Sequence, residues 1–201
     1  MQKCLCHFIE YPEEYSPIQG SVFRQFLDIC WPFTDFITFA TSENIIDLIA
    51  TRSYESNNPD RCDLASRDNY CALKKALHPW FAGSIIADEW FGYGSGGTKR
   101  YTYRYRATDG AKEAILSCYQ DIFLRLPNSP EIDKNEIGFF DDLCLFTNGR
   151  LFFGSISHEG ECYLWTDDRE LFKNILTIGR WITADEVSEQ ARIDINKYPW
   201  K

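Results

Sequence analysis

Apolar residues recur at helical spacing in several parts of this 201-residue chain. In each part, residues three or four positions apart would share one face of a helix, and a polar residue or proline stands where the helix would begin. The predicted helices begin near Ser16-Pro17, Asp68, Asp109, Asp167 and Thr183. Capping residues and proline at these places satisfy or remove the unpaired N–H groups of a first helical turn.

Other stretches carry the pattern of antiparallel strands joined by tight turns. Asn148-Gly149 lies between two apolar runs, and both residues tolerate the positive φ of a type I′ turn. With a second turn at Glu159-Gly160, this predicts a three-stranded meander over 141–166. A glycine-rich tip likewise predicts a hairpin over 84–107. Strands joined this way form an antiparallel sheet with helices packed on one face, which is the α+β class.

The length of the chain fits a single α+β domain over residues 1–201. Two polar stretches rich in Asn, Asp or Pro, 51–67 and 127–136, are possible sub-domain joints. Hydrophobic residues make up 44% of the chain and aromatic residues 16%, which is enough for a packed core and argues against disorder.

Charge is the strongest compositional feature. The chain has 30 acidic and 21 basic residues, a net charge of −9. Such a surface repels nucleic acids and anionic membranes and attracts basic proteins, although solubility alone would also explain it. The first residues lack a secretory pattern, and no apolar run is long enough to cross a membrane. We therefore expect a cytoplasmic protein with reduced cysteines, existing as a monomer or homodimer, with no nucleic-acid or membrane partner.

His158-Glu159 is the pair in the sequence that most resembles a catalytic or metal-binding pair. An imidazole beside a carboxylate can act as a general base with its orienting group, or contribute to a metal site together with Cys162. The spacing matches no metal or catalytic motif, so the pair is better explained as the polar tip of a turn. We predict no catalytic residue, no metal and no cofactor.

Three further patterns have both a chemical and a structural interpretation. Cys4-x-Cys6-His7 is rich in soft metal ligands but lacks a second ligand pair, and it also resembles an edge strand, so metal binding there stays open. The glycines of 92–97 suggest a phosphate loop, but a strand follows them instead of the helix that such a loop requires. Arg and Tyr alternate over 100–106, which could bind RNA but is more typical of a strand with Tyr inward and Arg outward.

The meander also predicts where its acidic residues gather. Asn148-Gly149 marks one end of the hairpin, so the strand start and the second turn lie together at the other end. This places Asp141, Asp142, His158, Glu159 and Glu161 in one cluster, and Asp167 and Asp168 toward the opposite end. We predict the five clustered residues as candidates for contact with a partner.

The run FTNGRLFFGSISHEGECYL, within residues 142–164, resembles the immunity proteins of bacterial polymorphic and contact-dependent toxin systems. The resemblance implies a non-enzymatic cytoplasmic inhibitor that binds and neutralises one cognate, basic toxin domain. No functional residue carries over, because that group shares a role more than a motif. Two other classes remain: a small hydrolase using His158, Glu159 and a cysteine, and a structural or regulatory module that dimerises through an exposed sheet edge.

Overall fold

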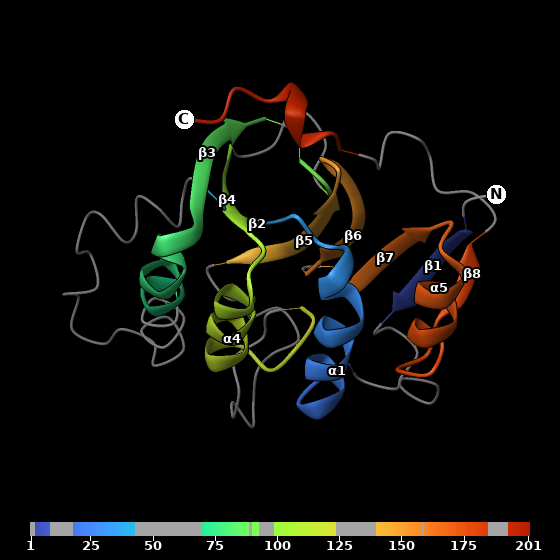
Figure 1. Ribbon diagram of the computed structural model, residues 1–201. Helices are drawn as coiled ribbons and strands as arrows, with labels where there is room; N and C mark the ends of the chain where they lie inside the picture. Colours follow the sequence, from blue (N-terminus) through green and yellow to red (C-terminus); the bar gives the residue numbers. More distant parts are fainter. Residues whose placement is uncertain are drawn as a thin grey trace, which may run out of the picture.

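The computed structural model describes residues 3–8, 18–42, 70–88, 90–92, 99–123, 140–157, 159–184 and 193–201. The strands in these ranges form one eight-stranded sheet, in the order β3-β4-β2-β5-β6-β7-β1-β8, with antiparallel neighbours throughout (Figure 1). Their bounds are β1 (Lys3–Phe8), β2 (Phe36–Ser42), β3 (Phe81–Ala87), β4 (Arg100–Arg106), β5 (Asp141–Thr147), β6 (Arg150–Ile156), β7 (Glu161–Thr166) and β8 (Ile182–Ala184). The α+β class is confirmed, as are both predicted strand systems.

Helices cover one face of this sheet (Figure 1). They are α1 (Ser21–Cys30), α4 (Asp109–Cys118), α5 (Arg169–Ile175) and an α-helical segment over 70–77. The apolar stripe of α1 is fully buried, and the ring of Phe26 lies 4.7 Å from that of Phe153 on β6. Burying such aromatic side chains supplies most of the energy that holds the helices on the sheet.

The other face is covered differently, by short segments without regular helix (Figure 1). A second apolar cluster there joins Trp90 and Phe91 to the chain end 193–201, which includes the 3₁₀ turn Ile195–Lys197. The indole of Trp200 lies 6.1 Å from that of Trp90, and its N–H donates to the Ile195 carbonyl at 2.6 Å. The sheet is thus buried on both faces, although the sequence predicted a cover on one face only.

Two predicted helix caps shift by one residue, and one predicted helix start lies in a strand. Thr108 caps α4 and Asp168 caps α5, each accepting a hydrogen bond from an N–H of the first turn. The predicted capping residues, Asp109 and Asp167, each lie one position from the observed cap. Thr183 lies in β8 and pairs with Leu5, so the predicted helix does not start at Thr183, and residues 185–192 lie outside the described part of the chain. Tertiary pairing with β1 outweighs the local capping pattern.

Two further outcomes concern the organisation of the chain. β1 lies between β7 and β8, so the expectation that residues 4–8 form an edge strand is wrong. The predicted joints 51–67 and 127–136 lie outside the described residues. The helix predicted to begin at Ser16-Pro17 begins instead at Ser21, and Gln19 before it forms an isolated bridge with Asp121. The single-domain prediction for 1–201 stays a prediction, although the described strands all belong to one sheet.

The turn at Asn148-Gly149 has the predicted conformation, with φ of 50° and 76°. We expect Gly149→Ala to destabilise the protein by about 1 kcal/mol, because an L residue with a Cβ is strained at that φ. The added Cβ would also meet the exposed side chain of Asn196, which can move aside. Urea unfolding measures the change. Asn148→Gly, which keeps φ accessible, should change stability less, and a larger loss in Asn148→Gly would contradict the explanation.

Candidate functional site

The predicted cluster at one end of the meander begins with the start of β5. The backbone N–H of Asp142 donates to the Ser157 hydroxyl at 3.1 Å, and the Ser157 N–H donates to the Asp142 carboxylate at 2.8 Å. These two bonds hold the start of β5 against the turn that follows β6. The prediction that Asp141 and Asp142 lie beside the second turn is therefore confirmed.

The expected exposure of the two aspartates is wrong. Asp142 is 0% and Asp141 is 6% exposed, so neither carboxylate belongs to an acidic outer surface. The reason is that β5 is not an outer strand, because β2 pairs along it and places Ala40 opposite Asp141. The register shifts between Thr38 and Ala40, and Asp142 adopts a φ of 56° at this irregularity. Such a β-bulge turns the side chain of the extra residue away from the regular alternation.

Burial gives the Asp141 carboxyl an unusual environment. Desolvation, followed by the neighbouring Asp142 carboxylate, raises the pKa of Asp141 well above its usual range, while the Arg100 charge opposes this rise. One oxygen of Asp141 is buried with no hydrogen-bond partner in the described part of the chain. A buried carboxyl group next to another acid does not ionise readily.

The remaining residues of the predicted cluster lie nearer to solvent. Glu159 is exposed, and Glu161 is partly exposed and accepts a hydrogen bond from the Tyr163 hydroxyl at 2.7 Å. His158 lies outside the described residues. Of the five candidates for contact with a partner, Glu159 and Glu161 are thus the two whose side chains the structure places at the surface.

Most of the cysteines whose side chains the structure describes are buried: Cys6, Cys30, Cys144 and Cys162 are buried, Cys118 is partly exposed and Cys71 is exposed. Cys162 is 0% exposed, and burial raises the pKa of its thiol, followed by the charge of Asp121. Burial also raises the pKa of Cys30 and Cys144. A buried thiol with a raised pKa is a poor nucleophile and a poor metal ligand. Among the described residues, no group of three His, Cys, Asp or Glu side chains could hold a metal ion.

The basic strand β4 has the predicted alternation. Tyr103 and Tyr105 are buried toward the helices, whereas Arg106 is exposed. The Arg104 guanidinium lies 4.6 Å from the ring centre of Trp200 and donates to the Ala82 carbonyl at 2.7 Å. Arg104 therefore fastens the C-terminal segment to the sheet through a cation–π contact, instead of offering its charge to a phosphate.

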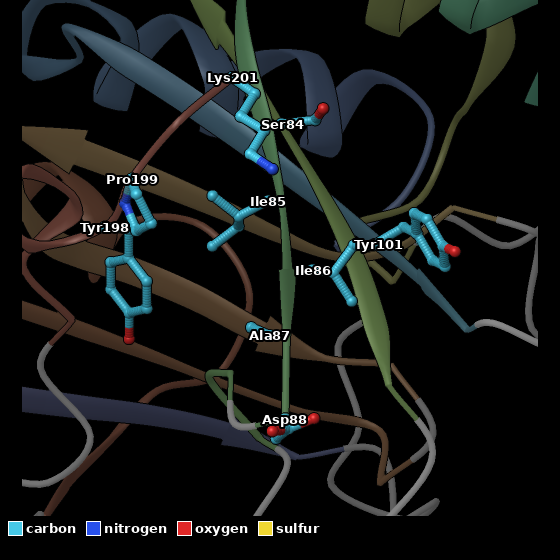
Figure 2. Close-up of a pocket in the computed structure, with 9 residues that line it drawn as sticks. All are labelled: Ser84, Ile85, Ile86, Ala87, Asp88, Tyr101, Tyr198, Pro199 and Lys201. Atoms are coloured by element: carbon cyan, nitrogen blue, oxygen red, sulfur yellow. The ribbon is translucent and has the colours of Figure 1, made fainter.

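The structure shows one feature that the sequence did not predict, a groove beside strand β3. It has a volume of about 520 Å³ and is lined by residues 84–88 of β3 and its end, by Tyr101 and by 198–201 of the chain end (Figure 2). Figure 2 shows Ile85 pointing toward Tyr198, with Asp88 and Lys201 at opposite ends. The segments that form this groove are far apart in sequence, so no local pattern could have indicated it.

Charge is distributed unevenly along the sequence. Residues 1–126 contain 16 acidic and 13 basic residues, and residues 127–201 contain 14 acidic and 8 basic residues. The C-terminal part therefore has the larger excess of negative charge. Asp167 and Asp168 are exposed before α5, toward the Asn148 end of the meander, as predicted.

Comparison of the chain with models of protein families, with curated proteins and with solved structures finds no match. None of the helices in the described ranges is long and apolar enough to cross a membrane. The molecule is thus defined by its fold class, an antiparallel eight-stranded α+β sheet, and by the surfaces described above.

Proposed function

We propose that this chain is a non-enzymatic, cytoplasmic inhibitor of the toxin-immunity class, which binds and neutralises a basic toxin domain. The observation that carries the proposal is the charge distribution. The chain has 30 acidic and 21 basic residues, and its residues 127–201 contain 14 of the acidic and 8 of the basic residues. Acidic segments of this kind accelerate the approach of a basic protein and favour it over acidic competitors.

The burial of Cys162 favours this proposal over a hydrolase that would use that cysteine. A hydrolase that uses His158, Glu159 and a cysteine needs the sulfur at a solvent-accessible site. Cys162, the cysteine nearest to that pair in sequence, is 0% exposed within the apolar core. A nucleophilic role for Cys162 would therefore require the β7 region to open.

The direct test uses the protein encoded by the reading frame next to this one. We expect a 1:1 complex, relief of the growth arrest that the neighbour causes on its own, and an association rate that falls steeply as NaCl rises from low to high concentration. Stopped-flow or surface plasmon resonance measures the rate. Absence of a complex, or an association rate that does not depend on salt, would overturn the proposal.

A pair of charge reversals tests which end of the meander faces the partner. We expect Glu159→Lys to slow association with that neighbour several-fold, because Glu159 is an exposed acid in the proposed contact cluster. Asp167→Lys changes the charge equally at the opposite end and is the matched control. Equal slowing by both variants would mean that net charge acts without a defined contact at the 158–161 turn.

A further inference from the structure

Strand β3 is the first strand of the sheet, so no other strand of the described residues covers its outer edge. Lys201 pairs with this edge at Ser84. Ser84 donates its N–H to the Lys201 carbonyl at 2.9 Å, and the Lys201 N–H donates to the Ser84 carbonyl at 3.0 Å. Two reciprocal bonds between the same two residues are the hydrogen-bonded pair of an antiparallel ladder.

The ladder does not continue to the next available position. Hydrogen-bonding groups point to alternate sides along a strand, so Ile86 directs its N–H and C=O to the same edge as Ser84. The antiparallel register would bring Pro199 opposite Ile86, and proline has no N–H to donate. The Trp200 N–H instead donates to the Tyr198 carbonyl at 3.0 Å, in a three-residue turn that bends the chain at Pro199.

This bend leaves an open edge beside the groove. Within the described part of the chain, the backbone N–H and C=O of Ile86 have no partner across that edge. The side chain of Ile86 is 58% exposed, which is unusual for a large apolar residue in a strand. The groove of about 520 Å³ lies between this edge and Tyr198-Pro199 (Figure 2). Unpaired strand edges with an adjoining apolar groove are the sites to which extended peptides add.

We propose that the groove binds an extended segment of a partner protein as an additional antiparallel strand, with a basic side chain opposite Asp88. This rests on the proposed function only in that the partner is a protein. Backbone pairing with Ile86 would supply the anchoring hydrogen bonds. Apolar side chains on either side of that position would lie against Ile85, Ala87 and Tyr198, which share one face of the groove.

The charges at the two ends give the segment a direction. A strand antiparallel to β3 runs from the Asp88 end toward the Lys201 end, in the same sense as residues 198–201. A cationic side chain should therefore precede the residue opposite Ile86, and the segment should end at that residue, because Lys201 already occupies the position opposite Ser84. A second copy of this chain fits less well, because antiparallel pairing of two β3 strands about Ile86 would place Asp88 of one copy opposite Ser84, where Lys201 already pairs.

The test uses two peptides of equal composition, acetyl-Ser-Val-Lys-Val-Thr-amide and acetyl-Ser-Val-Thr-Val-Lys-amide, with the full ¹⁵N-labelled chain. With its last residue opposite Ile86, the first peptide places Lys opposite Asp88, and we expect it, at millimolar concentration, to shift the amide resonances of Ile86 and Asp88 and to slow hydrogen exchange at Ile86. The second peptide should bind several-fold more weakly, because its Lys lies toward Lys201 instead of opposite Asp88.

Two variants separate backbone pairing from charge. Ile86→Pro removes the outward N–H at an edge position where proline is tolerated, and we expect roughly three- to tenfold weaker binding, the loss of one hydrogen bond. Ile86→Thr keeps the N–H and is the matched control. Asp88→Lys should remove the preference between the two peptides. It changes only an exposed side chain, so it still tests the proposal if Ile86→Pro does not fold.

The proposal is overturned if neither peptide shifts the β3 amides, if Ile86→Pro binds as well as Ile86→Thr, or if Asp88→Lys leaves the preference unchanged. A peptide that instead causes dimerisation of the chain would assign the edge to a second copy. No toxin takes part in this experiment. Failure of both peptides to bind would therefore reject the groove while leaving the proposed function intact.

Discussion

Gly154→Ala is expected to destabilise the protein by about 1 to 3 kcal/mol, the usual cost of overpacking a well-packed core. Gly154 lies in the middle of β6, and a Cβ built there would meet the ring of Phe91, with its Cδ1 atom only 2.6 Å away. The ring cannot move aside easily. It is 5% exposed and packs edge-on against Trp165, with ring centres 5.8 Å apart.

A double-mutant cycle shows whether the collision is the cause. In a Phe91→Ala background the obstacle is absent, so Gly154→Ala should cost little, or stabilise slightly because alanine restricts the unfolded chain more than glycine does. Urea unfolding of the four proteins measures the coupling. An equal loss from Gly154→Ala in both backgrounds would show that the ring does not limit this position.

Asp141→Asn is expected to stabilise the protein at neutral pH, by about 1 to 3 kcal/mol if the unsatisfied buried carboxylate is the main cost. Burial, followed by the Asp142 charge, raises the pKa of Asp141 in the folded state. The folded protein therefore binds a proton that the unfolded chain releases above about pH 4. Stability from this group is fully present below that pH and is lost as pH rises through the folded-state pKa. Asparagine keeps the shape without ionising, so it should remove this loss.

The measurement is urea unfolding of wild type and variant at pH 4 and pH 7.5. The two proteins should differ little at pH 4 and clearly at pH 7.5. Asp167→Asn is the matched control, since Asp167 is exposed and its replacement should change stability by less than about 0.5 kcal/mol. A variant less stable than wild type at pH 7.5 would mean that an ionised Asp141, with Arg100 beside it, contributes to the fold.

Local patterns in the sequence were sufficient for much of the fold. Asn148-Gly149 predicted the hairpin and its turn type because the positive φ of such a turn admits few residue pairs. The apolar stripe ending at Cys30 predicted α1, because helical spacing puts those residues on one face. The order of strands and turns in the meander also predicted that the start of β5 lies beside the turn after β6, as the bonds between Asp142 and Ser157 show.

Where local patterns failed, the cause was pairing between distant segments. Residues 36–42 form a strand between β4 and β5, and this insertion buries the two aspartates that the sequence placed on the surface. A pair of acids before an apolar run has the same local pattern whether the strand start is exposed or covered. Burial depends on which strand lies alongside, and that choice is not encoded within a short window.

By itself, then, the sequence determined the α+β class, the meander and the excess of acidic residues, because these follow from local spacing and composition. The tertiary structure alone decided the order of the strands, the burial of Asp141 and Asp142, and the groove between β3 and the chain end. Each of these depends on contacts between residues far apart in the chain. Such contacts are selected by the combined packing of the whole sheet, and not by the conformational preference of any one segment.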